Sequence, residues 1–252
     1  MRSIGRICFA LLLLAAQALA AEPKHLLLIG SGPDSHPPGT HEYMPGLTIL
    51  GELLGTHPGL AVEIVKADEP WQLGPELIAK ADGAVLFLSE GARWVSSDPR
   101  RADALAGLAA RGGGLAVLHW GMGTREPEPI GAFLNLFGGC HGGPDRKYQV
   151  LDAQLSFDRE HPATRGLEPI DIHDEFYYRL KFVQSPGLVP LAKVNIDGNS
   201  ETVAWAWSRP DGGRSFGFSG LHFHQNWELA AYRQLMQRGV LWTVKLDPQA
   251  AK

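Results

Sequence analysis

The sequence predicts an α/β fold built around a parallel sheet. Residues 24–30 (KHLLLIG) and 83–89 (GAVLFLS) are short apolar runs, as expected of strands that are buried on both faces. Segments with helical periodicity separate such runs, and one of them, at 101–110, ends close to three consecutive glycines. Because right-handed crossovers place connecting helices on both sides of a parallel sheet, this alternation predicts helices on both faces.

The expected elements alternate in the first half of the chain and become strand-rich afterwards. The first half is expected to contain strands at 24–30, 61–65, 83–89 and 115–119 and helices at 47–54 and 101–110. Beyond Gly121, strands are expected at 148–157, 189–194, 202–207 and 215–218, followed by a helix at 228–242. We interpret these later strands as a β-rich extension of the same sheet, so residues 21–252 are predicted to form a single domain.

The N-terminus has the pattern of a secretory signal peptide. A basic start with Arg2 and Arg6 precedes an apolar run at 7–16, and small residues follow at 18–20. The run is too short to be a stable bilayer anchor, and Cys8 lies inside it, which does not favour a lipoprotein anchor. We therefore expect cleavage after Ala20 and a mature protein that is periplasmic or secreted, without a stable membrane anchor.

Composition indicates which binding partners are disfavoured and what must stabilise the fold. Loss of two arginines with the leader takes the formal charge from −4 to −6, and the absence of basic clusters argues against nucleic acid as a partner. Cys140 is then the one cysteine left, so a core rather than an intrachain disulfide must stabilise the fold. The glycines at 112–114 precede a strand, so they are not a dinucleotide fingerprint. The oligomeric state is left open.

Histidines gather after the expected strand ends, where ligands bind in open parallel sheets. The chain has ten histidines, and those near strand ends are His36, His41, His119, His141, His222 and His224. Converging imidazoles can bind zinc, and His222 and His224 would point to the same side of an extended segment, so a divalent metal such as zinc stays open as a cofactor. His25, His57 and His161 are expected to be structural or solvated.

A second polar group lies in HDEFYY, residues 173–178. Asp174 and Glu175 can accept hydrogen bonds from sugar hydroxyls, and Tyr177 can cover an apolar face of a sugar ring. Glu175 and His222 are candidates for a general acid and base, because modest burial brings their pKa values towards neutrality. The alternative reading is an exposed acidic turn followed by packing aromatics. Trp227 is expected to begin the last helix and to support the histidines.

In its order of motifs, the chain resembles the ThuA-like family of trehalose utilisation, a branch of the class I glutamine amidotransferase-like superfamily. The resemblance spans nearly the whole mature chain and is carried by HPPGTHEY, GGGLAVLHWG, HPATRGLEPIDIHDEFYY, VAWAW and GRSFGFSGLHFHQNW. It implies a flavodoxin-like, doubly wound and mainly parallel sheet. It also implies carbohydrate chemistry on a disaccharide or a 3-keto sugar, commonly alongside sugar oxidoreductases.

The resemblance also implies where a nucleophile would stand. The amidotransferases place a cysteine in the elbow after a strand, and a histidine near the C-terminal end activates it. Here the elbow reads Leu118-His119-Trp120-Gly121, so Trp120 takes the position of the cysteine and His222 that of the activating histidine. Because a tryptophan cannot attack a carbonyl, glutamine hydrolysis is disfavoured.

Three functions stay open. In the first, an enzyme of sugar catabolism works by acid–base chemistry with His119, Glu175 and His222 as catalytic residues. Its substrate-binding residues are expected to be His36, His41, His141, Asp174, Tyr177, His224 and Trp227. In the second, a lyase or hydrolase uses a divalent metal held by some of these histidines. In the third, the same rim binds a sugar without transforming it, as an accessory protein would.

Overall fold

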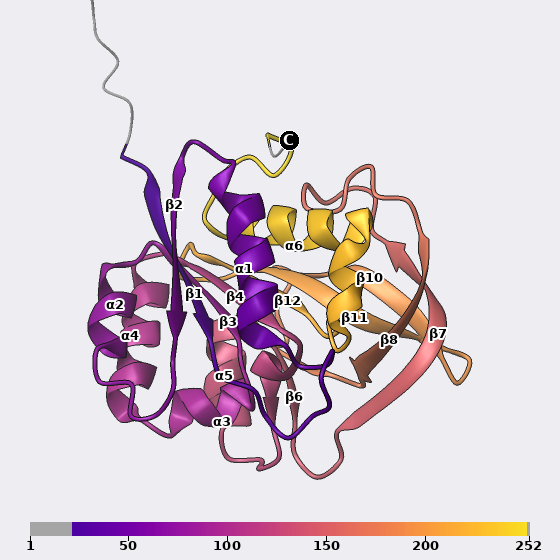
Figure 1. Ribbon diagram of the computed structural model, residues 1–252, viewed down its shortest axis with the longest axis horizontal. Coiled ribbons are helices and arrows are strands. Elements are labelled where there is room, and N and C mark those ends of the chain that lie inside the picture. Colours follow the sequence, from indigo (N-terminus) through magenta and orange to yellow (C-terminus); the bar gives the residue numbers. More distant parts are fainter. Residues whose placement is uncertain (1–21, 251–252) are drawn as a thin grey trace, which may run out of the picture.

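The computed structural model describes residues 22–250, so the predicted signal peptide with its cleavage site lies outside the described residues. A nine-stranded sheet runs through the molecule in the order β2-β1-β3-β4-β12-β11-β10-β7-β8 (Figure 1). The first five strands in this order pair in parallel, and the others join antiparallel. The predicted doubly wound fold with a β-rich extension is confirmed, because the parallel half has the flavodoxin-like order in which β12 takes the fifth place.

The strands of the large sheet lie close to their predicted ranges, except β8, which was not predicted. They are β1 (Lys24–Gly30), β2 (Leu60–Lys66), β3 (Gly83–Phe87), β4 (Gly114–Leu118), β7 (Lys147–Phe157), β8 (Ile170–Tyr178), β10 (Leu188–Ile196), β11 (Asn199–Ser208) and β12 (Arg214–Phe218). A small second sheet joins β5 (Gly123–Thr124), β6 (Gly139–Gly142) and β9 (Lys181–Phe182). The HDEFYY segment therefore belongs to a strand, β8, and not to an exposed turn.

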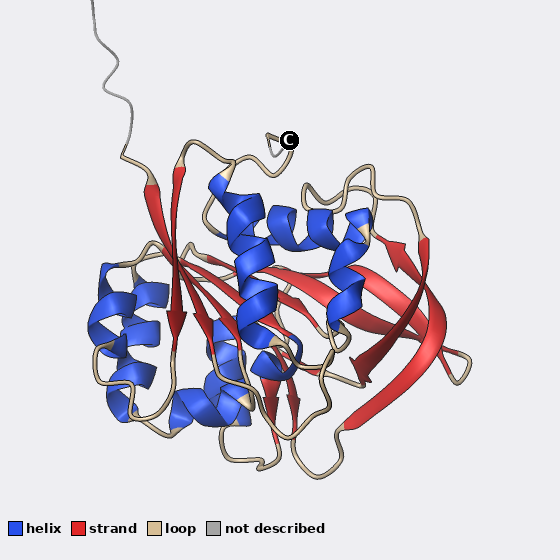
Figure 2. Ribbon diagram, in the orientation of Figure 1, coloured by secondary structure: helices blue, strands red, loops and turns tan. Residues whose placement is uncertain are grey.

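Helices cover both faces of the parallel half (Figure 2). They are α1 (Tyr43–Gly55), α2 (Gly74–Lys80), α3 (Gly91–Ser96), α4 (Pro99–Ala110), α5 (Ile130–Phe137) and α6 (Ala230–Thr243), with 3₁₀ turns at His119–Met122 and His224–Glu228. Helices α1 and α6 pack on one face, and α2, α4 and α5 belong to the other. Within the described part of the chain, no helix is long and apolar enough to cross a bilayer.

Each face of the sheet has its own core, because side chains alternate along a strand. On β1, Leu26 and Leu28 face the core under α1 and α6, while Leu27 and Ile29 face the core under the other helices, and all four are fully buried. This explains why the run is apolar without interruption. Parallel strands of this kind end at a common edge, and that edge carries the site described below.

Local signals set several helix boundaries. Asp98 caps α4, since its carboxylate accepts a hydrogen bond from the backbone N–H of Arg100, and Pro99 occupies the first turn, where no N–H is needed. Helix α5 ends at Gly138, whose φ of 78° is a left-handed conformation suited to glycine. Helix α1 begins at Tyr43, earlier than predicted, and Pro45 is tolerated there because it lies in the first turn. The short helices α2, α3 and α5 were not predicted.

Candidate functional site

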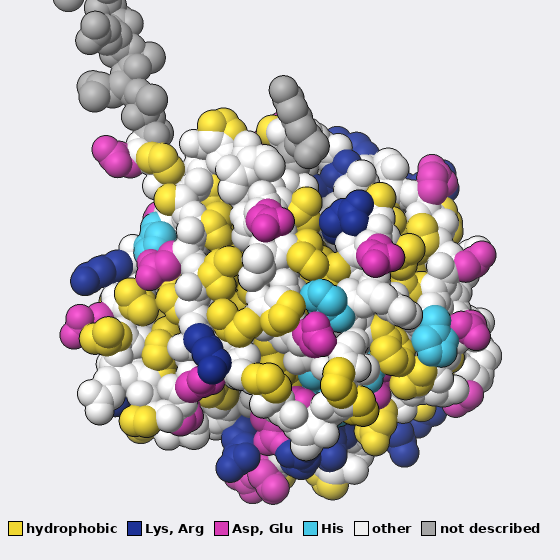
Figure 3. Space-filling view, in the orientation of Figure 1, with side chains coloured by type: hydrophobic (Ala, Val, Ile, Leu, Met, Phe, Trp, Pro, Cys, Tyr) yellow, Lys and Arg dark blue, Asp and Glu magenta, His cyan; other side chains and the backbone are white. Residues whose placement is uncertain are grey.

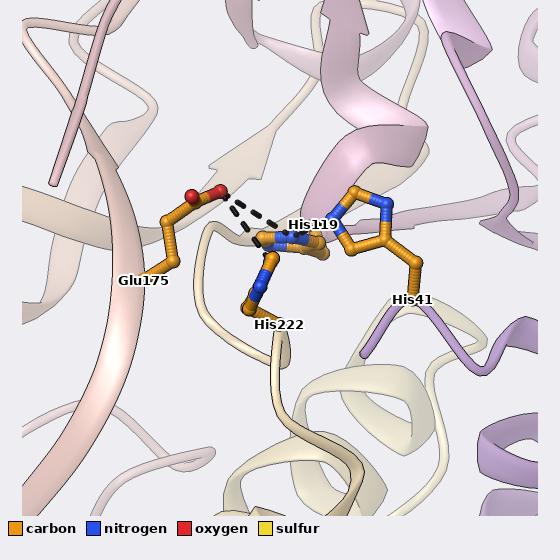
Figure 4. Close-up of side chains that lie close together, drawn as sticks. All are labelled: His41, His119, Glu175 and His222. Carbon is orange, nitrogen blue, oxygen red and sulfur yellow. Dashed lines mark hydrogen bonds and ion pairs between the residues drawn. The ribbon is translucent and has the colours of Figure 1, made fainter. Parts of the chain in front are cut away.

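Three histidines and one glutamate from distant segments meet at the edge where the parallel strands end. The group consists of His41, His119, Glu175 and His222, and one ligand atom from each lies within 4.8 Å of the others. Figure 4 shows Glu175 extending from its strand towards His119 and His222, with His41 on the opposite side. We refer to these four residues as the histidine cluster. The sequence predicted that all four belong to one site, and the fold brings them together.

His119 occupies the strained position of the elbow after β4. Its φ is 46°, a left-handed conformation that is unusual for a residue other than glycine, and its side chain is completely buried. The family resemblance implies that Trp120 takes the nucleophile position, but the strained residue of this turn is His119. The Nδ1 of His119 lies 2.8 Å from the carbonyl oxygen of Ser219, just beyond β12.

The elbow is packed tightly against the start of α3. A side-chain carbon on Gly91 would collide with the carbonyl oxygen of Gly121, so the two segments approach as closely as glycine allows. Glu90, directly before Gly91, is also left-handed, with a φ of 46°. The positions of the residues in this turn, including His119, are therefore fixed by backbone packing rather than by the side chains alone.

His41 is held by a carboxylate that the sequence analysis did not identify. Its Nδ1 lies 2.9 Å from Oδ2 of Asp34, and the Tyr43 hydroxyl donates to the same oxygen at 2.8 Å. His36 contacts the other oxygen, Oδ1, through its Nδ1 at 2.7 Å, and its ring stacks on His41 at 3.6 Å. Partial burial raises the pKa of Asp34, but the hydrogen bonds from His41, His36 and Tyr43 outweigh it, and the pKa is lowered overall. Asp34 is therefore an ionised acceptor.

These partners assign the tautomers of two rings. The Nδ1 of His119 faces a carbonyl oxygen and must carry a hydrogen, and the Nδ1 of His41 must carry one because it faces an ionised carboxylate. In a neutral imidazole the other nitrogen then has a lone pair and no hydrogen. The two remaining nitrogens, Nε2 of His41 and Nε2 of His119, lie 2.9 Å apart. Two acceptors thus face each other inside the cluster.

Glu175 and His222 complete the cluster from β8 and from the loop after β12. Oε1 of Glu175 lies 3.5 Å from Nδ1 of His222 and 3.9 Å from Nε2 of His119. Nδ1 of His222 is buried and has no hydrogen-bond partner within residues 22–250. Glu175 makes no other ion pair in that part of the chain, so its carboxyl group is free to interact with a ligand.

Burial moves the pKa values of this cluster in opposite directions. It lowers the pKa of His119 well below its ordinary value, with the neighbouring His41 and His222 adding to the effect. It lowers the pKa of His222 to about 4. It raises the pKa of Glu175 to about 7, helped by the charge of Asp174. At neutral pH the imidazoles are therefore uncharged, and Glu175 exchanges a proton readily.

Asp174 corrects one sequence-based assignment. It was expected to bind substrate, but its side chain is fully buried and points into the loop after β12. Its carboxylate accepts hydrogen bonds from the backbone N–H groups of Leu221 at 2.8 Å and His222 at 3.1 Å, and from the Tyr232 hydroxyl at 2.9 Å. Burial raises the pKa of Asp174 to about 6, although these hydrogen bonds act to lower it. Asp174 therefore positions the loop that carries His222.

Two cavities adjoin the histidine cluster. The smaller, of about 130 Å³, is lined by His36, His41, Trp120, Arg125, His141, Arg146, Tyr148, Glu175 and Tyr177. The larger, of about 650 Å³, shares His36 and His41 with it and is otherwise rich in proline. We call the smaller one the polar pocket. Because Glu175 opens into the polar pocket and not into the larger cavity, the polar pocket is where a ligand would meet the cluster.

The remaining predicted site residues divide into two groups. His141 and Tyr177 line the polar pocket with their rings stacked at 4.0 Å, and burial lowers the pKa of His141 to about 3. His224 and Trp227 do not line it. His224 lies 3.7 Å from Glu42, and Trp227 is buried in the core within a 3₁₀ turn before α6. Their predicted contact with substrate is therefore not supported by their positions.

The sequence analysis missed Asp34, which holds His41, and three residues that line the polar pocket. Asp34 stands two residues before His36, and this spacing of a carboxylate and an imidazole in one loop was an available signal. Arg125, Arg146 and Tyr148 lie in loops or at a strand start and carry no pattern that marks them. Arg125 contacts Glu90, and Tyr148 is largely exposed at 59%. Lys/Arg and Asp/Glu side chains lie side by side at the lower edge of the face in Figure 3.

The histidines that were expected to be structural lie away from the cluster. His25 pairs with Glu63 at 2.9 Å, and the ring of His57 accepts a hydrogen bond from the backbone of Gly59. His161 packs edge-on against Trp242, with the ring centroids 4.8 Å apart. These contacts are of the kind expected for structural histidines.

Comparison with known families agrees with the motifs. The sequence model of the family named ThuA, described as trehalose utilisation, matches residues 35–243. This chain belongs to the ThuA family. The matched range contains the whole histidine cluster and the strained elbow after β4. No curated protein sequence matches the chain.

Solved structures extend the likeness of this ThuA chain at the level of the fold. A ThuA-like protein from Bacteroides uniformis superposes with a TM-score of 0.68 and 15% identity, over 91% of this chain and 96% of that chain. An α-L-fucosidase, isoenzyme 2 from Paenibacillus thiaminolyticus, superposes with a TM-score of 0.52 and 10% identity, over 87% of this chain and 32% of that chain. At such identities the likeness concerns the fold alone.

Proposed function

We propose that this ThuA protein is an enzyme of carbohydrate utilisation that acts on a disaccharide or a 3-keto sugar by proton transfer. One observation carries the proposal: the carboxyl group of Glu175 lies within 3.9 Å of two neutral imidazoles and opens into the polar pocket. A carboxyl group that is buried beside imidazoles can donate and accept protons at neutral pH. Membership of the trehalose utilisation family supports a sugar as the substrate.

A cysteine mechanism does not fit the chain. Cys140 is buried, and its thiol donates to the carbonyl oxygen of Met122 at 3.3 Å. Burial raises the pKa of Cys140 to about 12, so the thiolate that would attack a carbonyl is scarce. The elbow offers an imidazole in place of a thiol. These features support acid–base steps at the cluster rather than a thioester intermediate.

The lining of the polar pocket suits a sugar ring. Trp120 and Tyr148 offer aromatic surface for the C–H faces of a pyranose, whereas the ring of Tyr177 already stacks on both His119 and His141. Arg125 and Arg146 offer N–H donors for hydroxyl oxygens. The polar pocket is small, at about 130 Å³, so we place a single ring in it. In this proposal the reacting ring lies in the polar pocket, and the second ring of a disaccharide extends outwards past Tyr148.

A 3-keto group would make the reaction feasible at this site. The carbonyl acidifies the C–H bond beside it, so a positioned base can remove that proton and an acid can return one elsewhere. Elimination, hydration and isomerisation all follow this course. Glu175 is the group placed to carry the proton, and His119 and His222 lie beside it. We further propose that the protein acts in the periplasm or after secretion, downstream of sugar oxidoreductases that form 3-keto sugars.

The test is a panel of disaccharides and their 3-keto derivatives, incubated with the purified mature chain and analysed by mass spectrometry. We expect product from wild type and a loss of at least about 100-fold in rate for Glu175→Gln. The matched control is Glu42→Gln, which changes a carboxylate outside the polar pocket and should retain the rate. Tight sugar binding without product from any member of the panel would replace the proposal with a sugar-binding accessory protein.

A further inference from the structure

We propose that the histidine cluster is a binding site for one divalent transition-metal ion of the zinc class, held by Nε2 of His41, Nε2 of His119 and Nδ1 of His222. The ion would be the electrophile of the proposed function, so its role in catalysis rests on that function. The binding of the ion does not depend on the proposed function. Three separate features of the cluster support the assignment: two facing lone pairs, an unpartnered buried nitrogen and a set of outer hydrogen bonds.

The first feature is the pair of Nε2 atoms 2.9 Å apart, in His41 and His119. Both atoms bear lone pairs, because the hydrogen of each neutral ring is committed to Nδ1. Two lone pairs at this distance repel each other unless a positive charge lies beside them. A metal ion supplies that charge, and neutral imidazole nitrogen is the ligand that zinc-class ions prefer.

Tyr177 does not remove this repulsion. Its hydroxyl lies 3.1 Å from Nε2 of His119, but its ring stacks on His119 with an interplanar angle of 17°. The hydroxyl is therefore offset from the plane that contains the lone pair of Nε2. The ring of His41, in contrast, meets His119 edge-on at 83°. The Nε2 lone pair of His119 thus stays available for an ion.

The second feature is Nδ1 of His222. It is buried and has no hydrogen-bond partner in the described part of the chain, which is unfavourable for a polar atom unless a ligand satisfies it. The atom lies within 4.8 Å of the Nε2 atoms of His41 and His119. Three nitrogens from three separate loops therefore converge, and three imidazoles with an open fourth position are the arrangement of a catalytic zinc site.

The third feature is the outer ring of hydrogen bonds. Metal-bound histidines commonly donate their other N–H to a carboxylate or a backbone carbonyl, which fixes the ring. Asp34 receives the Nδ1 hydrogen of His41, and the Ser219 carbonyl receives that of His119. The backbone of His222 is held by Asp174. The rings of His41 and His119 are thus oriented before an ion arrives, and the backbone that carries His222 is fixed.

The ligand set also indicates the class of ion. Calcium and magnesium prefer oxygen ligands, whereas three imidazoles favour zinc, cobalt or nickel. Glu175 stands beside the nitrogens and lines the polar pocket, so a water or a sugar oxygen on the ion would meet its carboxylate. In this assignment His119 and His222 act as ligands, and Glu175 alone carries the proton.

The experiment is a titration of the full mature chain, purified without a histidine tag and stripped with a chelator, with Zn²⁺ by calorimetry and with Co²⁺ by visible absorption. We expect one ion per chain and the intense absorption of low-symmetry cobalt. His222→Gln should weaken metal binding by at least about 100-fold. Loss of a hydrogen-bond partner of a ligand already lowers metal affinity by about 10- to 100-fold, and loss of the ligand itself should lower it at least as much. His224→Gln, two residues away and outside the cluster, is the matched control.

The outcomes separate this inference from the proposed function. Absence of binding by wild type, or equal binding by wild type and His222→Gln, would overturn the metal site and leave a proton shared between His41 and His119 as the explanation of their contact. Should His222→Gln fail to fold, the cobalt spectrum of wild type decides alone, because an ion bound only by surface carboxylates gives weak octahedral absorption. Metal binding without turnover of any sugar would retain the site and reject the proposed function.

Discussion

Nε2 of His41 lies 2.9 Å from Nε2 of His119, although 78 positions separate the two residues in the sequence. The contact joins the loop after β1 to the elbow after β4 at the edge of the sheet where a doubly wound fold binds its ligands. In the amidotransferase-like superfamily, the elbow is the position of a nucleophile. Here the strained elbow presents the imidazole of His119 to two other imidazoles and a carboxyl group.

Replacing Asp34 with Asn should weaken the site without removing a ligand. The amide can still accept a hydrogen bond from His41, but it lacks the charge that holds the ring in its present tautomer. We expect the affinity for Co²⁺ to fall by about 10- to 100-fold, measured by the titration described above. Asp68→Asn is the control, because Asp68 is an exposed carboxylate that pairs with Lys66. Equal losses in the two variants would contradict the role given to Asp34.

Replacing Asp174 with Asn should destabilise the fold. Asp174 is fully buried, and its two oxygens accept from backbone N–H groups of the loop after β12, so an amide nitrogen in their place leaves donors without partners. We expect the free energy of unfolding in urea to fall by about 2 to 3 kcal/mol. Asp171→Asn, at an exposed position of the same strand, should change it little. A neutral effect of Asp174→Asn would show that the loop does not depend on this carboxylate.

The elbow can be tested through a pair of glycines. An alanine methyl at Gly91 meets the carbonyl oxygen of Gly121, whereas one at Gly131 of α5 meets nothing within 4 Å. Overpacking of this kind costs about 1 to 3 kcal/mol, so Gly91→Ala should lower the melting temperature. Gly131→Ala should raise it, because alanine favours a helix by up to about 1 kcal/mol. Equal melting temperatures for the two variants would mean that α3 and the elbow are not in close contact.

His161 should make stability depend on pH. Burial lowers the pKa of His161 to about 4 in the folded chain. The charge of Asp158 acts to raise this pKa, and the charges of Arg214 and Arg165 lower it further. In the unfolded chain the pKa stays near 6.5. As pH falls from 6.5 to 4, the unfolded state binds a proton that the folded state does not, so stability decreases. His161→Gln should reduce the slope of unfolding free energy against pH in that window. An unchanged slope would indicate that the ring is protonated in the folded state.

The sequence predicted that several candidate-site residues converge, but it did not predict every element around them. His41, His119 and His222 follow strands that were visible as apolar runs, and parallel strands must end at one edge, so their convergence could be expected. Glu175 was found for its residue type, but its position depends on β8 at the far end of the strand order, which a single sequence does not specify. The short helices α2, α3 and α5 were missed because they have too few turns for a periodic pattern.

For Asp174 and Trp227, residue type alone suggested a contact with substrate that their positions do not support. Asp174 and Trp227 have side chains that bind sugars in many sites, yet both are buried. Buried and exposed side chains do not alternate along the second half of β8, where Asp174, Glu175, Phe176 and Tyr177 are all buried. Which of these side chains reaches the polar pocket depends on tertiary packing. Trp227 packs in the core beneath the loop that carries His222. Burial, which decides between a ligand contact and a structural role, is set by contacts that are distant in the sequence.

The most direct test of this account compares wild type and Glu175→Gln on a 3-keto disaccharide, with product followed by mass spectrometry and folding checked by urea unfolding. The account predicts steady product formation by wild type and a loss of at least about 100-fold in the variant at unchanged stability. A folded Glu175→Gln protein that turns the sugar over at the wild-type rate would contradict it, because no other carboxyl group lines the polar pocket in the described chain.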